Sequence, residues 1–98
     1  MVSDCRALLI LKQADILYGR KRYMEVAVLL RDWLLEVCDD ETKWFAHKTK
    51  TALNAIVHKD GPKTVNKWRS ATKAQIKAKV TDALSYYEYC LINRGLKM

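Results

Sequence analysis

Hydrophobic residues recur along this chain with the spacing of helices from one end to the other. No segment alternates between apolar and polar residues for long enough to mark a strand, and only one Pro and three Gly interrupt the pattern. Ser3 can cap a first helix, which Gly19 ends, and Ser70 or Thr72 can cap the last. The pattern predicts helices at about 4–18, 22–38, 39–59 and 62–69, and a long final helix ending at 94–95. We therefore expect an all-α fold, a compact bundle of four to five helices.

The second predicted helix is apolar on nearly all of its surface. Val28 and Leu30 fall on opposite sides of it, and only four charged residues form a polar strip. A helix of this kind is normally buried, so we expect it to be the central element of the bundle. The long C-terminal helix has one clean apolar stripe with which to pack: Ile76, Val80, Ala83, Leu84, Tyr87 and Leu91.

The first predicted helix has more apolar surface than one contact needs. One stripe runs through Ala7, Leu11, Ala14 and Tyr18, and a second contains Cys5, Leu9 and Ile16. A small monomer cannot easily hide both, so residues 1–42 are a candidate hairpin for a homodimer. The alternative is that the C-terminal helix covers the second stripe.

Composition and charge define one domain, residues 1–98, with an uneven distribution of charge. Residues 43–79 carry ten Lys and Arg against the single acid Asp60, a net charge of +9. Residues 1–42 carry −2 and residues 80–98 carry 0, so the basic segment accounts for the whole formal charge of +7. We expect 1–42 to be a scaffold, 43–79 a basic face, and 80–98 the end of the C-terminal packing helix. Such a face attracts a polyanion or an acidic protein surface.

Several classes of protein are disfavoured by the sequence. No apolar run approaches the roughly 20 residues of a membrane span, and the start of the chain lacks the pattern of a secretion signal. The three widely spaced cysteines, Cys5, Cys38 and Cys90, are typical of buried thiols in a reducing cytoplasm. No phosphate loop, nucleophile motif or clustered metal ligands are present. We expect no enzymatic activity, no cofactor, no metal and no membrane partner.

Two neighbouring aromatic residues occupy different positions in the predicted third helix. Phe45 falls in the apolar stripe and is expected in the core, whereas Trp44 falls on the flank near Lys48. An indole beside lysines can stack on a base. The alternative, which we favour for Trp44, is packing beneath a neighbouring helix.

Residues 52–70 contain the most specific motif. The run Pro62-Lys63-Thr64-Val65-Asn66-Lys67-Trp68-Arg69 resembles the recognition helix of helix-turn-helix DNA-binding proteins. Val65 and Trp68 would anchor it to the preceding helix, and Ala55 is the small residue that permits close crossing. The turn departs from the family, because Lys59 and Asp60 replace the usual Gly and apolar residue. The resemblance implies that Lys63, Asn66, Lys67 and Arg69 point outward toward phosphates and base edges. The alternative is a short connector anchored by Val65 and Trp68.

Two functions follow as hypotheses. The first is a small nucleic-acid-binding regulator, with DNA favoured over RNA. The second is a protein-binding modulator, an inhibitor or adaptor whose basic face docks on an acidic or nucleic-acid-binding surface of a larger protein. The candidate anion-binding residues are Lys43, Lys48, Lys50, Lys63, Asn66, Lys67, Arg69, Lys73 and Lys77.

Overall fold

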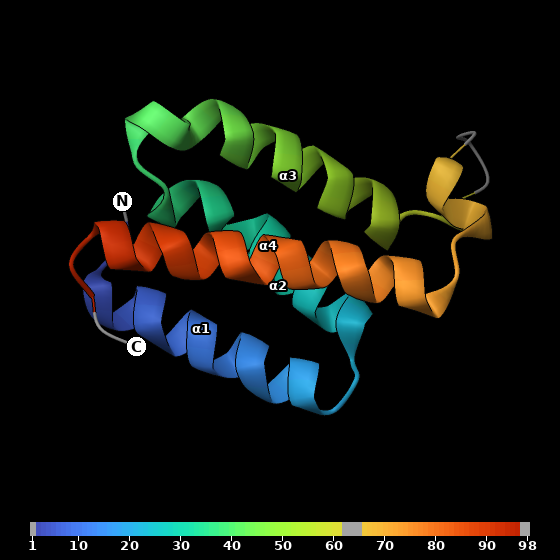
Figure 1. Ribbon diagram of the computed structural model, residues 1–98, viewed down its shortest axis with the longest axis horizontal. Coiled ribbons are helices and arrows are strands. Elements are labelled where there is room, and N and C mark those ends of the chain that lie inside the picture. Colours follow the sequence, from blue (N-terminus) through green and yellow to red (C-terminus); the bar gives the residue numbers. More distant parts are fainter. Residues whose placement is uncertain (1, 62–65, 97–98) are drawn as a thin grey trace.

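Four α-helices lie along one another in the computed structural model of this chain, which describes residues 2–61 and 66–96 (Figure 1). Within these ranges there is no strand, so the expected all-α bundle is confirmed. Two short 3-10 helices complete the secondary structure. The elements are α1 (Asp4–Gly19), α2 (Tyr23–Val37), η1 (Asp40–Thr42), α3 (Lys43–Val57), η2 (Lys67–Ser70) and α4 (Lys73–Asn93).

Side-chain caps fix the starts of the first and last helices. The Ser3 hydroxyl accepts a hydrogen bond from the Arg6 N–H at 3.2 Å, which satisfies one of the free donors at the start of α1. The sequence left Ser70 and Thr72 as alternatives for α4, and Thr72 is the cap. Its hydroxyl accepts from the Gln75 N–H at 3.1 Å, and the Gln75 side chain accepts from the Thr72 N–H at 2.8 Å, forming a capping box.

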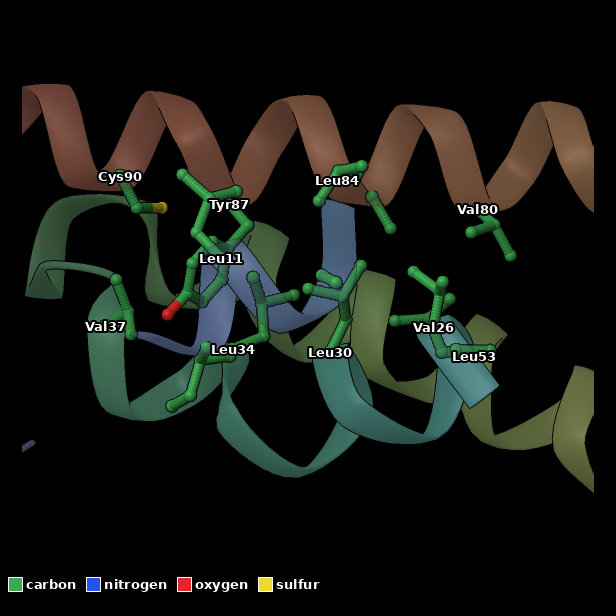
Figure 2. Close-up of a cluster of buried hydrophobic side chains, with 14 of the residues drawn as sticks. Leu11, Val26, Leu30, Leu34, Val37, Leu53, Val80, Leu84, Tyr87 and Cys90 are labelled. Carbon is green, nitrogen blue, oxygen red and sulfur yellow. The ribbon is translucent and has the colours of Figure 1, made fainter. Parts of the chain in front are cut away.

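The second helix is the centre of the bundle, as expected. It packs against α1, α3 and α4, and its Val26, Leu30 and Leu34 are fully buried. Figure 2 shows the side chains of α4 pointing toward α2, with Tyr87, Leu84 and Val80 facing the α2 row. The apolar residues on opposite sides of α2 are explained by this arrangement, because three helices surround it.

Hydrogen bonds between distant residues tie α4 to α1. The Tyr87 hydroxyl, fully buried, donates to the Ala7 carbonyl oxygen at 2.7 Å. Near the chain ends, Arg94 donates to the carbonyl oxygen of Val2 at 3.0 Å and pairs with the Asp4 carboxylate at 2.6 Å. The first and last turns of the described chain therefore meet at one end of the bundle.

Three packing expectations were wrong. Phe45 is 40% exposed, because the buried face of α3 runs through Ala46, Thr49, Leu53 and Ile56, and residue 45 lies beside that face. Trp44 does not pack beneath a helix, since 68% of it is exposed. The Cys5 thiol is exposed rather than buried. In the same stripe of α1, Leu9 is 48% and Ile16 is 47% exposed, so of the two open alternatives, coverage of this stripe by α4 is excluded.

Within residues 2–61 and 66–96, none of the helices combines the length and hydropathy that crossing a bilayer would require.

Candidate nucleic-acid interface

One end of the bundle gathers positive charge from three separate parts of the chain. The α1–α2 turn, the end of α3, and the stretch from η2 into the first turns of α4 lie at this end (Figure 1). Residues 19–25, 58–61 and 66–77 together carry eight cations against the two acids Glu25 and Asp60. We call this region the basic end; its cations are Arg20, Lys21, Arg22, Lys59, Lys67, Arg69, Lys73 and Lys77.

Three of these lysines line a single hollow. Lys21 from the α1–α2 turn, Lys59 from the end of α3, and Lys73 from the start of α4 border a space of about 280 Å³. Its apolar wall is formed by Tyr23, Met24, Ala71 and Ile76. Lysines from three segments thus line one concave surface, an arrangement that raises the local positive potential.

The carboxylates at the basic end are already paired. Arg22 contacts Glu25 at 2.6 Å, and Lys59 contacts Asp60 at 2.9 Å. In the part of the chain that the structure describes, no carboxylate forms an ion pair with Lys21 or Lys73. The charge of these lysines is therefore available to an external anion.

Lys77 joins the basic end through an aromatic contact. Its Nζ lies 5.9 Å from the centre of the Tyr23 ring, a cation–π distance. This contact holds the second turn of α4 against the start of α2, beside the hollow. Lys77 itself remains exposed.

Asn66 does not point outward, contrary to the sequence expectation. Its side-chain N–H donates to the Ala55 carbonyl oxygen at 2.7 Å, and its side-chain oxygen accepts from the Trp68 N–H at 2.9 Å. Its backbone is extended, with φ −119° and ψ 121°, so Asn66 is not part of a helix. The 3-10 helix η2 follows it, in place of the last turn of the helix expected at 62–69. Residues 62–65, including the candidate Lys63, lie outside the described residues.

Arg69 is also bonded to the protein's own backbone. Its guanidinium donates to the carbonyl oxygens of Lys59 and Gly61. Together with Asn66, it satisfies carbonyl groups at and just after the end of α3, where helix carbonyls lack partners and a cation is favoured. Arg69 still adds charge to the basic end, but its side chain also joins η2 to the backbone that follows α3.

Trp68 packs against the core, as both interpretations of the motif required. Lys67 Nζ lies 5.6 Å from the centre of its ring. The indole N–H is buried without a hydrogen-bond partner among the described residues. A second hollow, of about 460 Å³, lies between η2 and α4, where Trp68 and the side chains of Lys67 and Lys79 border it.

The other predicted site residues do not join this end. Lys43 opens α3, so it lies about 24 Å from Lys59 along the helix direction, against the acidic stretch 36–40. Lys48 and Lys50 are exposed on α3 between the two ends. The predicted site is therefore divided: Lys67, Arg69, Lys73 and Lys77 come together, and Lys43 is separated from them.

Sequence reasoning missed the contribution of the α1–α2 turn. Residues 1–42 have a net charge of −2, and this total gives no sign of the three consecutive cations Arg20, Lys21 and Arg22. Lys21 has φ 61°, the left-handed region that non-glycine residues rarely adopt. Three consecutive cations in a turn beside Gly19 were the available signal, but their proximity to residues 59 and 73 required the fold.

The chemistry of the basic end suits an anion rather than a metal or a covalent reaction. Among the described residues, no cluster of three His, Cys, Asp or Glu could hold a metal ion. Burial raises the pKa of the Cys90 thiol to about 11 and also raises that of Cys38. Both sulfurs are thus kept protonated and poorly nucleophilic.

The fold and the site define a small all-helical protein with a concentrated cationic surface at one end. Comparison of the chain with known protein families, curated proteins and solved structures found no match.

Proposed function

We propose that this protein is a small non-enzymatic nucleic-acid-binding regulator that contacts phosphates through its basic end. The observation that carries the proposal is the hollow where Lys21, Lys59 and Lys73 meet from three segments. Lys67 and Lys77 add to the positive surface of the basic end. Phosphate contacts of this kind supply affinity without reading sequence.

Sequence reading by Asn66 does not belong to the proposal, because its amide is bonded to Ala55 and Trp68. The resemblance to helix-turn-helix proteins remains a prediction on residues 52–70. DNA is favoured over RNA on that resemblance alone. A reducing, cytoplasmic location is proposed from the free cysteines.

The direct experiment measures binding to nucleic acid as salt is varied. A labelled random duplex DNA, its single strand and an RNA duplex of the same length are titrated with the protein by fluorescence anisotropy. Counterion release predicts a log–log slope of about −0.9 per neutralised phosphate for the DNA duplex, so three or four contacts give roughly −3. No binding to any probe at low salt would refute the proposal.

A second candidate function is the protein-binding modulator, whose basic end docks on an acidic or nucleic-acid-binding protein surface. One observation favours it: the side chains of Asn66 and Arg69, which were expected to contact nucleic acid, are hydrogen-bonded to the protein's own backbone. Affinity capture of partners before and after nuclease treatment distinguishes the two functions. A partner retained after nuclease, together with no oligonucleotide binding, supports the modulator.

Self-association, expected from the first helix, is retained as a proposal, and the structure offers two apolar surfaces for it. The first is the uncovered stripe of α1, containing Leu9 and Ile16. The second lies where α3 begins and α4 ends, at the opposite end of the bundle from the lysine-lined hollow, and contains Trp44 and Tyr89.

A further inference from the structure

Four aromatic rings and one isoleucine form a continuous apolar surface where α3 begins and α4 ends. We call it the aromatic patch: Trp44, Phe45, Tyr86, Tyr89 and Ile92. Ring centres are 5.6 Å apart for Trp44 and Phe45, 4.7 Å for Phe45 and Tyr86, and 6.4 Å for Tyr86 and Tyr89. Ile92 lies one turn after Tyr89 on α4. The rings therefore contact one another from the first turn of α3 across to α4.

A hydrogen bond holds the central ring of the patch, Tyr86, in place. Tyr86 is half-buried, and its hydroxyl donates to the Thr42 carbonyl oxygen at 3.0 Å, which joins α4 to the start of α3. Burial raises the pKa of Tyr86 to about 12, so this donor stays protonated at neutral pH. A surface whose rings are already positioned loses little conformational entropy when a partner binds.

The patch leaves a substantial apolar area open to solvent. Trp44 is 68%, Phe45 40%, Tyr89 50% and Ile92 59% exposed. Given roughly 150–250 Å² for a whole aromatic side chain, the three rings expose about 300 Å², and Ile92 brings the total to the order of 400 Å² of mostly apolar surface. That is about half of the roughly 800 Å² that each partner contributes to a standard interface. A surrounding polar rim supplies the remainder in typical interfaces.

We propose that the aromatic patch is the interface of a homodimer, in which it packs against the same patch of a second copy. The position of the charges favours this occupant. Lys73 begins α4 and Tyr89 lies about 24 Å further along it, several Debye lengths at physiological salt. Two copies joined at the patch keep their basic ends apart, whereas contact near those ends would bring like charges together.

The rim of the patch carries both signs of charge. Asp40 and Glu41 precede Trp44 in the chain, and Lys48 follows it by one helical turn. A two-fold interface repeats each contact, because residue i of one copy meets residue j of the other and j also meets i. A contact between the acids of one copy and Lys48 of the other would therefore form twice.

The uncovered stripe of α1 is the weaker candidate. Ile16 borders a hollow of about 390 Å³ between α1 and α2, whose rim includes the acids Glu25 and Asp32. Both acids are already paired, Glu25 with Arg22 and Asp32 with Arg31, so neither offers a charge to a second copy. The stripe also lacks aromatic side chains, which dominate the binding energy of interfaces.

Sedimentation equilibrium of the full chain over a range of concentrations, without nucleic acid, tests this proposal. The test variant is Trp44→Gln with Tyr89→Gln, and the matched control is Leu9→Gln with Ile16→Gln on α1. Each pair exchanges two exposed apolar residues for neutral polar ones, so net charge is unchanged. We expect a wild-type dimer, a dissociation constant raised at least about 100-fold in the test variant, and no comparable change in the control.

Three results would overturn the proposal: a wild-type monomer at every concentration, an unaffected dimer in the test variant, or a dimer lost only in the α1 control. Circular dichroism of each variant checks that the helices are retained. Oligonucleotide binding by the test variant provides a separate readout. If the wild type is monomeric and the test variant no longer binds oligonucleotides, Trp44 or Tyr89 would be assigned to base stacking instead.

Discussion

Asn66 donates a hydrogen bond from its side-chain amide to the carbonyl oxygen of Ala55, across 2.7 Å and eleven residues of chain. Ala55 lies in the last turn of α3, where carbonyl groups lack partners within the helix. The nearby Lys59 N–H bonds to Ile56 instead, so Asn66 supplies the donor that Ala55 needs. The residue expected to read bases therefore caps the end of a helix.

Asn66→Ala should destabilise the protein without changing any preference among nucleic-acid sequences. The change removes two hydrogen bonds and leaves a half-buried carbonyl unpaired, which costs about 1–3 kcal/mol. Urea unfolding followed by circular dichroism measures the loss, with Asn93→Ala, an exposed residue of α4, as the control. Unchanged stability with altered sequence preference would restore the outward-facing interpretation.

Regular elements were predictable from sequence because burial and capping are local patterns. The near-continuous apolar surface of α2 predicted its central position, and Ser3 was correctly identified as a helix cap. The cap of α4 remained ambiguous between Ser70 and Thr72 until the Gln75 partner was seen.

The site was harder to predict because its residues converge through tertiary structure. Lys21 and Lys73 are more than fifty residues apart, and only the packing of α2 against α4 brings them to one hollow. The outward orientation expected for Asn66 was wrong for a related reason. An amide side chain both donates and accepts hydrogen bonds, so it can face solvent or bond to a free backbone carbonyl, and the sequence does not distinguish the two. Lys43 was grouped with the others by charge, although a helix of 15 residues separates it from them.

Tyr87→Phe should lower stability by about 0.5–1.5 kcal/mol, because it removes a buried hydrogen bond to the Ala7 carbonyl while keeping the ring. Tyr89→Phe is the control, since that residue is 50% exposed. Burial raises the pKa of Tyr87, so its donor remains protonated across the usual pH range. Equal unfolding midpoints for the two variants in urea would show that the Tyr87 bond contributes nothing.

Cys5 should be the only thiol of the native protein that reacts rapidly with a thiol reagent. Cys38 and Cys90 are buried, and burial raises the pKa of both. Titration with a chromogenic disulfide should give one fast equivalent, and Cys5→Ser should abolish it. Three equivalents should appear in urea. Rapid reaction of Cys90 in the folded protein would contradict the packing of α4.

Glu88→Gln should stabilise the protein near neutral pH. Burial is the main cause that raises the pKa of Glu88, and the neighbouring Asp15 raises it further. As pH rises above the ordinary value, the unfolded state loses this proton before the folded state does, so stability falls. A thermal midpoint higher than wild type near pH 7, with the difference vanishing below about pH 4, is expected. A lower midpoint near neutral pH would contradict this.

The basic end itself is tested most directly by comparing two double variants for binding to a random DNA duplex at several salt concentrations. Lys21→Gly with Lys73→Ala removes two lysines from the hollow, and glycine avoids strain at the positive φ of residue 21. Lys48→Ala with Lys50→Ala removes the same charge from the outer surface of α3. The hollow variant should bind more weakly, with a log–log salt slope shallower by about two, whereas the α3 variant should stay close to wild type. Equal losses in the two variants, or a larger loss in the α3 variant, would contradict the assignment of binding to the basic end.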